Sequence, residues 1–455
     1  MSHAALTELV ADLPDGMVVT DPDILGSYRQ DRAADPDAGT PLALVRPAST
    51  ADVQATLRWC TAHRVAVVTR GAGTSLSGGS TAVDGALVLC TERMRGISID
   101  RSTRTATVQP GLLNAELKAA AAEQGLWYPP DPSSFDICSI GGNVATNAGG
   151  LCCVKYGVTA DYVLGLEVVL ADGRAIRVGG RQIKDSAGLP LTRMFVGSEG
   201  VLGIITEVIL RLLPPQPAAS TVVGIFPSIT EASRAVLAVT DQIRPAMLEF
   251  MDQVAINAVE DMVTMGLPRD AAALLIAQSD APGAAGASDV ALIQQAFDAH
   301  GATESFTTDD PAEGEAFTAA RRAAIPAVER LGSLLLEDVG VPLPMLPNLI
   351  DGVAAIAADQ QVTISVVAHA GDGNTHPLIA YDPTDPAQQE RAQVAFGQIM
   401  DLAISLGGTI TGEHGVGRLK KGWLPDQVGE DVMQVTAAVK AALDPDGLLN
   451  PGVIL

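Results

Sequence analysis

The chain is poor in cysteine and in positive charge, and these two shortages exclude several classes of protein. It has 455 residues but five cysteines, at Cys60, Cys90, Cys138, Cys152 and Cys153, and no two of them are spaced Cys-x-x-Cys. This usage argues against a zinc ribbon, a disulfide framework and an iron–sulfur cluster held by the chain itself. The 29 lysines and arginines are outnumbered by 53 aspartates and glutamates, and the net charge of −24 disfavours nucleic acid and anionic lipid as partners.

Long apolar runs and fixed repeats are missing as well. No segment has the length and composition of a membrane-spanning helix, and the N-terminus lacks a signal-peptide pattern, so the sequence predicts a cytoplasmic protein that does not cross a membrane. The chain is 47% hydrophobic and too long for one core, so two or three domains are expected. A small anionic substrate would need a local positive site on so acidic a chain.

Two glycine-rich stretches, Arg70–Ser80 and Ser139–Gly150, offer bare backbone to a ligand. Glycine lets backbone N–H groups come close to an anion and point at it, which suits a flat ligand with phosphates. The first stretch is not a Walker loop, because no Gly-Lys-Ser/Thr follows, and not a Rossmann fingerprint, because Leu76 occupies the third glycine position. A plain surface loop is the alternative for each stretch taken alone.

The remaining pattern predicts alternating strands and helices. A hairpin with a type I′ turn is predicted at Asp172-Gly173, and the run Pro214–Pro217 predicts a domain boundary. The second half is typical of an α+β domain with helices on one face of a mostly antiparallel sheet. Its strands are expected near residues 222, 274, 335 and 364, and its helices near residues 232, 291, 321, 350, 394 and 433.

Three of the six histidines lie in two glycine-rich segments of the second half. His369 and His376 flank the turn Gly371–Asn374, and if the chain folds back there the two imidazoles face each other with Cβ atoms about 4.5–5.5 Å apart. Glu413 could then supply a third ligand, and two histidines with one carboxylate suit Zn, Mn or Fe(II) in a catalytic role. The alternative is a pair of histidines that form hydrogen bonds in a buried turn.

Two other features could act on a substrate. His414 adjoins Glu413, and an imidazole beside a metal is a candidate general base. Arg321 and Arg322 lie on a predicted helix that is rich in alanine. A guanidinium that extends from such a helix can bind a carboxylate through two hydrogen bonds. A solvated helix face is the alternative for this arginine pair.

Five motifs in one order resemble the FAD-dependent D-2-hydroxyacid dehydrogenases of the vanillyl-alcohol-oxidase and p-cresol-methylhydroxylase superfamily. Among these, the glycolate oxidase catalytic subunits and the D-lactate dehydrogenases are the most similar. The resemblance covers about residues 41–455. The motifs are Arg70–Ser80, Tyr128–Gly150, Phe195–Gly203, His369–His376 and Gly412–Gly415.

The resemblance implies an α+β fold with three parts. Residues 1–217 would form an FAD-binding domain of the p-cresol-methylhydroxylase type, built from two α+β subdomains. Residues 218–418 would form an α+β cap with an antiparallel sheet, which holds the substrate and the metal. Residues 419–455 would pack back on the FAD domain.

The resemblance also implies the site residues. FAD would be bound without a covalent bond, because Thr74 and Ser75 stand where some relatives carry a linking histidine. His369, His376 and Glu413 match the ligands of a divalent metal. His414 matches the catalytic base, and Arg321 matches the group that binds the substrate carboxylate. The residues expected to contact FAD are Arg70, Gly71, Ala72, Gly73, Thr74, Ser75, Gly78, Pro110, Gly111, Asp131, Ser139, Gly142, Asn143, Thr146, Asn147, Gly149, Glu199, Gly200, Ile205 and Asn450.

The implied reaction oxidises a D-2-hydroxy acid to the 2-keto acid, by metal-assisted proton abstraction and hydride transfer to flavin N5. Leu336 and Leu378 stand where D-2-hydroxyglutarate enzymes carry a lysine and an asparagine, which favours a monocarboxylate such as D-lactate or glycolate, or a bulkier apolar 2-hydroxy acid. The alternatives are D-2-hydroxyglutarate, another alcohol oxidised without a metal, a non-catalytic flavoprotein subunit, and a metal- or anion-binding module with no cofactor.

The cysteine shortage also bears on the partners. Because the chain has no cysteines for a cluster, electrons must leave to a separate acceptor, which could be an iron–sulfur subunit, an electron-transfer flavoprotein, a quinone or oxygen. A protein docked on such a partner could work in the cytoplasm or at the inner membrane. The sequence leaves the oligomeric state open, with a homodimer among the possibilities.

Overall fold

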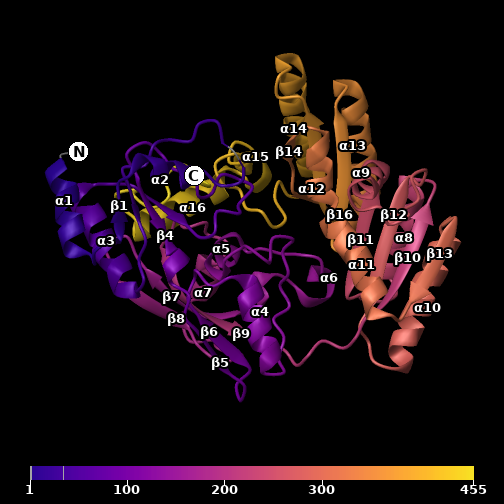
Figure 1. The fold of residues 1–455 in the computed structure, drawn as a ribbon, viewed down its shortest axis with the longest axis horizontal. Coiled ribbons are helices and arrows are strands. Elements are labelled where there is room, and N and C mark those ends of the chain that lie inside the picture. The colour runs from indigo at the N-terminus through magenta and orange to yellow at the C-terminus, as the bar shows by residue number, and fades with distance from the viewer. Residues whose placement is uncertain (1–2, 34) are drawn as a thin grey trace. The chain divides into compact units, whose positions relative to one another are not determined.

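The computed structural model describes residues 3–33 and 35–455, and the chain divides into two compact units (Figure 1). The sequence predicted domains over 1–217, 218–418 and 419–455. Unit 1 consists of Met1–Ala148, Val158–Pro215 and Glu413–Leu455, and unit 2 consists of Gly149–Gly157 and Gln216–Gly412.

Unit 1 contains a four-stranded sheet in the order β1-β2-β4-β3, with β2 and β3 both parallel to β4. Helix α3 (Thr50–His63) connects β2 to β3. It begins where Ser49 and Asp52 form a capping box, and it ends where Arg64 takes a left-handed conformation. The sequence predicted this helix, and Val53 and Leu57 on its inner face join the core. The strands are β1 (Val18–Val19), β2 (Ala43–Val45), β3 (Val67–Arg70) and β4 (Leu87–Cys90).

A second sheet of unit 1 has five antiparallel strands in the order β5-β6-β9-β7-β8. The predicted hairpin between β7 and β8 is present, but its turn is not type I′. That turn needs positive φ at both central residues, whereas Gly173 has φ of +80° and Asp172 does not share this conformation. The strands are β5 (Ile97–Asp100), β6 (Thr105–Val108), β7 (Val163–Val169), β8 (Ala175–Gly179) and β9 (Ile204–Arg211).

The second glycine-rich stretch is in large part a helix, which the sequence did not predict. Helix α5 (Ile140–Thr146) begins at Ser139, whose hydroxyl accepts the N–H of Gly142, and ends at Asn147 in a left-handed conformation. Buried Ile140 and Val144 anchor it in the core of the five-stranded sheet. The other helices of the unit are α1 (His3–Asp12), α2 (Pro22–Ser27), α4 (Asn114–Glu123), α7 (Leu191–Phe195), α15 (Leu424–Val428) and α16 (Glu430–Leu443).

The C-terminal segment belongs to unit 1, together with the N-terminal part of the chain. Leu449 lies beside Val67 in a parallel bridge, and the N–H of Asn450 donates to the carbonyl of Val67 at 2.7 Å. Leu449 and Val453 are buried, one in the core of each sheet. The bridge places Asn450 beside the start of β3.

Unit 2 contains an antiparallel sheet in the order β13-β10-β12-β11-β16-β17-β14, with β15 beside β17. The antiparallel sheet confirms the predicted α+β cap. The strands are β10 (Ser220–Phe226), β11 (Met247–Asp252), β12 (Ala273–Ser279), β13 (Glu304–Thr308), β14 (Ser333–Leu336), β15 (Val339–Gly340), β16 (Thr363–His369) and β17 (Asn374–Tyr381). The helices are α6 (Cys153–Tyr156), α8 (Ile229–Thr240), α9 (Gln253–Val263), α10 (Ala284–Ala299), α11 (Pro311–Arg322), α12 (Ala324–Val328), α13 (Leu346–Gln360) and α14 (Pro386–Ser405).

The helices of unit 2 cover both faces of its sheet, so the expectation of one covered face was wrong (Figure 1). Along β12, Leu275 and Ala277 belong to the core that includes α8, α10, α13 and α14. Leu274 and Ile276 belong to the core that includes α9 and α12. Successive strand residues point to opposite faces, and a strand buried on both faces is apolar throughout. None of the helices in the described part of the chain combines the length and apolar character that crossing a membrane requires.

The short excursion Gly149–Gly157 is held in unit 2 by one buried carboxylate. The side chain of Asp280 accepts hydrogen bonds from Lys155, Tyr156 and, at 3.2 Å, Gln216. Burial raises the pKa of Asp280, but these three donors outweigh burial and leave the pKa below its usual value. The chain therefore enters unit 2 for nine residues and is fastened there by a charge-assisted contact.

We expect Asp280→Ala to lower the thermal midpoint of unfolding by several degrees. The side chain of Asp280 is fully buried, and removing one partner of a buried ion pair costs about 3 kcal/mol. Asp261→Ala is the matched control, because Asp261 and its partner Arg269 are both more than half exposed and such pairs contribute little. Equal midpoints for the two variants in a thermal melt would show that the buried carboxylate does not fasten the excursion.

Candidate active site

Two of the predicted cofactor segments meet in unit 1 at the hydroxyl of Ser139. This oxygen accepts the N–H of Ala72 at 3.3 Å and the N–H of Gly142 at 3.3 Å. A side chain at Gly71 would overlap the same oxygen, so only glycine allows this approach. The loop after β3 and the start of α5 therefore form one surface.

A third predicted segment, Pro110-Gly111, lies against the same helix. The N–H of Gly141 donates to the carbonyl of Pro110 at 2.8 Å, and a Cβ at Gly141 would lie 2.5 Å from the Cβ of Pro110. A side chain at Gly111 would overlap the carbonyl of Thr91. Segments that are far apart in the sequence can therefore pack closely here, because glycine at positions 111 and 141 leaves room for the neighbouring chain.

Arg70 places a positive charge under the first loop. Its guanidinium lies 5.6 Å from the ring centre of Tyr28 and donates to the carbonyl of Gln30 at 3.0 Å. A side chain at Gly73, which has φ of +74°, would overlap this guanidinium. The loop Gly71–Gly78 therefore combines backbone N–H groups with a fixed cation, which suits the pyrophosphate of a dinucleotide.

Unsatisfied polar atoms show that the residues of this surface fit a polar ligand. The hydroxyl of Thr69 and the Oδ1 of Asn450 are buried and have no hydrogen-bond partner among the described residues. A Cβ at Gly200 would lie 3.5 Å from the Thr69 hydroxyl and 3.6 Å from the Nδ2 of Asn450. Buried polar groups are normally paired, so these atoms are suited to a bound cofactor.

Other predicted cofactor residues use their side chains within the protein. The hydroxyl of Thr146 donates to the carbonyl of Gly142 at 3.2 Å, and Oδ1 of Asn147 accepts the N–H of Ala160 at 2.8 Å. The carboxylate of Glu199 accepts from the backbone of residues 416 and 417. Gly149 belongs to unit 2.

In unit 2, the predicted hairpin brings His369 and His376 together. His369 ends β16 opposite Asn374, and His376 lies in β17 opposite Val367, so the two histidines are diagonal rather than direct cross-strand neighbours. Their ring centres are 5.1 Å apart at an interplanar angle of 88°, and each offers a ring nitrogen within 4.8 Å of the other. Both side chains are buried. The hairpin was predicted correctly, and the diagonal register differs from the expected one.

Glu249 was missed by the sequence analysis, and it holds two of the predicted residues. Its carboxylate accepts a hydrogen bond from Nδ1 of His369 at 2.9 Å and lies 2.9 Å from Nε of Arg321. Each of the three side chains is at most 3% exposed. Donation from Nδ1 makes Nε2 the lone-pair nitrogen of the neutral ring, which is how carboxylates orient histidine ligands around metals. The one sequence signal was a carboxylate with apolar residues on both sides, in the run of residues 247–251.

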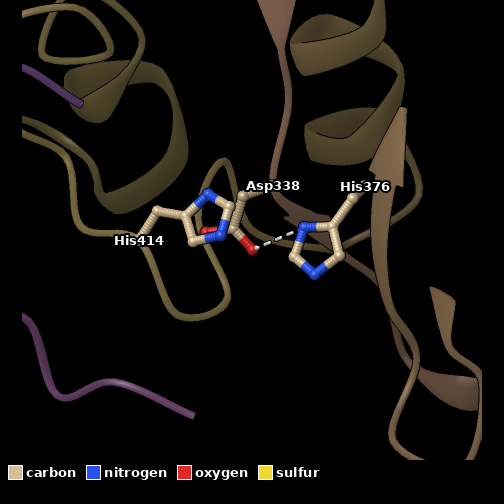
Figure 2. Close-up of side chains that lie close together, drawn as sticks. All are labelled: Asp338, His376 and His414. Atoms are coloured by element: carbon tan, nitrogen blue, oxygen red, sulfur yellow. Dashed lines mark ion pairs between the residues drawn. The ribbon is translucent and has the colours of Figure 1, made fainter. Parts of the chain in front are cut away.

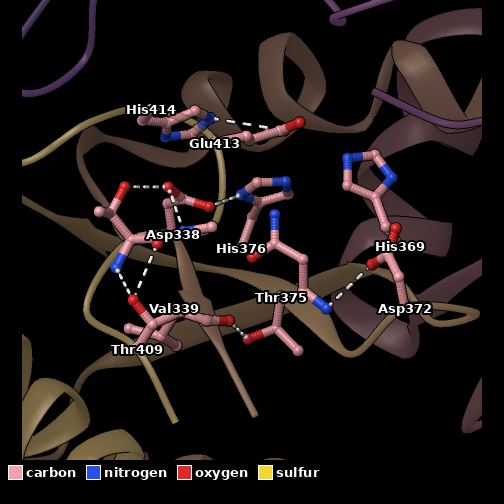
Figure 3. Close-up of polar contacts among 12 residues, drawn as sticks. Asp338, Val339, His369, Asp372, Thr375, His376, Thr409, Glu413 and His414 are labelled. Carbon is pink, nitrogen blue, oxygen red and sulfur yellow. Dashed lines mark hydrogen bonds and ion pairs between the residues drawn. The ribbon is translucent and has the colours of Figure 1, made fainter. Parts of the chain in front are cut away.

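Asp338 is the second buried carboxylate near the histidines. Figure 2 shows it directed at the ring of His376, with 3.8 Å between Oδ1 and Nδ1. Its other oxygen accepts the hydroxyl of Thr411 at 2.6 Å and the N–H of Gly412 at 3.0 Å, in the network drawn in Figure 3. Gly412 ends unit 2, so Glu413 is one residue beyond a backbone position fixed beside His376.

Glu413 and His414 open the last segment of unit 1. Nε2 of His414 lies 3.8 Å from the carboxylate of Glu413, and the carbonyl of His414 accepts the hydroxyl of Ser77 at 3.2 Å. Both side chains are less than 16% exposed. Ser77 belongs to the same glycine-rich loop as Gly73, so this loop also holds the backbone of the predicted base.

The comparisons with known proteins agree with a flavin-binding oxidoreductase. Residues 41–179 match the family model described as FAD binding domain, and residues 215–454 match the one described as FAD linked oxidases, C-terminal domain. The chain is 43% identical to the glycolate oxidase subunit GlcD of Bacillus subtilis, over 90% of this chain and 88% of that protein. It is 34% identical to D-lactate dehydrogenase of Archaeoglobus fulgidus, over 92% and 93%.

The fold is shared more widely. A solved structure of p-cresol methylhydroxylase with substrate bound superposes with a TM-score of 0.82 at 18% identity, covering 99% of this chain and 96% of that one. The chain belongs to the FAD-linked oxidases, as its motifs indicated. It is an FAD-binding flavoprotein oxidoreductase, and the predicted fold class is confirmed.

Proposed function

We propose that this enzyme oxidises a short D-2-hydroxy monocarboxylic acid, of the D-lactate or glycolate type, to the 2-keto acid. The observation that carries the proposal is the buried chain Arg321–Glu249–His369 beside His376. It combines an arginine for a carboxylate with two imidazoles for a cation that polarises an alcohol. The names of the relatives, glycolate oxidase subunit and D-lactate dehydrogenase, favour the same class of substrate.

A divalent metal fits the donors of unit 2. His369 is oriented by Glu249 in the manner of a metal ligand, and His376 lies beside it. We assign Glu413 as the third ligand, because it follows the fixed residue Gly412 and completes a set that suits Zn, Mn or Fe(II). When bound, such a cation acts as a Lewis acid toward the alcohol oxygen of the substrate.

Arg321 is assigned as the group that binds the substrate carboxylate, and His414 as the group that accepts the hydroxyl proton. Arg321 forms an ion pair with Glu249, with Nε 2.9 Å from the carboxylate, and its Nη2 is buried without a hydrogen-bond partner among the described residues, which leaves a donor for an anion. His414 would remove the hydroxyl proton as a general base. Bound FAD, held without a covalent bond, would supply the hydride acceptor.

Leu336 and Leu378 support the choice of a monocarboxylate. The two residues pair directly across β14 and β17. Two apolar side chains in register offer no hydrogen bond to a second carboxylate, and burying an unpaired charge there would be costly. Dicarboxylates such as D-2-hydroxyglutarate are therefore expected to be poor substrates.

The electron acceptor is proposed to be a separate molecule. The five cysteines form no disulfide among the described residues, and four of them are buried. Burial raises the pKa of Cys60 and Cys90 to about 12, so these two thiols stay protonated near neutral pH and are poor nucleophiles. An iron–sulfur subunit, an electron-transfer flavoprotein, a quinone or oxygen would take electrons from the flavin, and the name of the Bacillus subtilis relative describes a subunit.

A substrate panel tests the proposal. Purified protein with FAD is assayed with D- and L-lactate, glycolate, D-2-hydroxyglutarate and an artificial electron acceptor. D-lactate or glycolate should be oxidised at least about tenfold faster than D-2-hydroxyglutarate, in terms of kcat/KM, because the second carboxylate finds no partner. Preference for the dicarboxylate, or oxidation of simple alcohols only, would contradict the proposal.

A further inference from the structure

The loop after His414 is a tight turn that forms hydrogen bonds with one carboxylate. The two oxygens of Glu199 accept the N–H groups of Val416 and Gly417, each at 2.8 Å. Gly415 and Gly417 have φ of +89° and +56°, so the chain turns sharply here. One side chain thus binds two consecutive amides immediately downstream of the proposed base.

The turn is packed so closely that neither of its glycines could carry a side chain. A Cβ at Gly415 would lie 2.9 Å from Cδ of Glu199, and a side chain at Gly417 would overlap the carbonyl of Ser77. Ser77 adds three contacts of its own. Its hydroxyl donates to the carbonyl of His414, and its carbonyl accepts the N–H groups of Arg418 at 2.9 Å and Leu419 at 3.2 Å. Ser77 therefore holds both ends of the turn, and Glu199 holds its middle.

Glu199 is itself fixed in an uncommon conformation. Its φ of +48° is rare for a residue with a side chain, and its backbone is held by the carbonyl of Ala145 at 2.8 Å and by Nδ2 of Asn450 at 2.6 Å. Burial raises the pKa of Glu199 to about 7, against the opposing effect of the two N–H donors. A strained and desolvated carboxylate is costly, which points to a role beyond filling space.

We infer that Glu199 is a positioning residue for His414. Its carboxylate binds the amides of Val416 and Gly417 and so fixes the backbone that carries the imidazole. The inference rests on the proposed role of His414 as the base. Because Ser77 belongs to the loop that is expected to hold FAD, the same contacts link the cofactor loop to the position of the base.

Glu199→Gln tests this assignment with little change in shape. The amide can accept one of the two N–H groups, but its own NH₂ opposes the other. FAD content should be unchanged, and the rate of flavin reduction should fall about 10- to 100-fold at unchanged KM, the range expected for loss of one hydrogen bond to a charged group. Hydrogen exchange at Val416 and Gly417 should become faster. Glu207→Gln, on β9 beside exposed Arg177, is the matched control and should change none of these.

Three outcomes would overturn the assignment. These are unchanged hydrogen exchange at Val416 and Gly417, loss of FAD from the variant, and faster exchange without a slower reduction. If Glu199→Gln does not fold, Ser77→Ala removes the contact to the carbonyl of His414 and should change exchange and rate in the same directions. A wild-type protein whose flavin no 2-hydroxy acid reduces would contradict the proposed function instead, while the exchange experiment still tests the contact.

Discussion

Replacement of His414 by alanine is expected to leave FAD bound and to slow flavin reduction by a D-2-hydroxy acid about 10²- to 10⁴-fold. This is the usual contribution of a positioned general base. The side chain of His414 is mostly buried, and the turn that follows it is bound by Glu199 and Ser77, so its position is well defined. The measurement is the rate of flavin bleaching after anaerobic mixing with substrate in a stopped-flow instrument.

The control for this variant is His300→Ala. His300 ends helix α10 in unit 2, and no part of the proposed chemistry uses it. In the His300→Ala variant, the substrate should reduce the flavin at the wild-type rate. If the same were true of His414→Ala, the proton would have to be taken by another group, and the assignment of His414 would fail.

Replacement of His376 by alanine is expected to abolish tight metal binding and to slow flavin reduction at least about 10²-fold. Only two of the three proposed metal ligands would remain in this variant, so the metal would bind weakly. The reaction would then lose the charge stabilisation by the Lewis acid, which amounts to several kcal/mol. Glu249→Gln should have a smaller effect, because it removes the carboxylate that orients His369 rather than a ligand. Mutation of a group that orients a metal ligand typically lowers metal affinity about 10- to 100-fold.

Metal content and reduction rate are measured together for these two variants. Metal analysis of dialysed samples gives the stoichiometry, and stopped-flow absorbance gives the rate. Both metal content and reduction rate should be highest in the wild type, lower in Glu249→Gln and lowest in His376→Ala. Wild-type metal content in His376→Ala, or wild-type rates without metal, would remove the imidazole pair from the mechanism.

Local rules were sufficient for several parts of this fold. Ser49 and Asp52 mark the start of α3 with a capping box, and the glycine turn between His369 and His376 forms the predicted hairpin. These features depend on residues that are close in sequence, where turn and capping chemistry decide the conformation. The candidate ligands of unit 2 could be named for the same reason.

Other parts depend on contacts that no local pattern encodes. Glu249 pairs with His369 across β11 and β16, and 120 residues separate them in the chain. Ser139–Gly150 is glycine-rich, yet burial of Ile140 and Val144 stabilises a helix there despite the low helix propensity of glycine. Both faces of the cap sheet are covered, which a count of helices in the sequence could not reveal.

The most direct test of the account is anaerobic mixing of the purified yellow protein with D-lactate and with glycolate, before and after treatment with a chelator. We predict that one of the two bleaches the flavin, that the chelated protein reacts at least about 10²-fold more slowly, and that a divalent cation restores the rate. Unchanged bleaching by the metal-stripped protein, or no bleaching by either acid, would contradict the account.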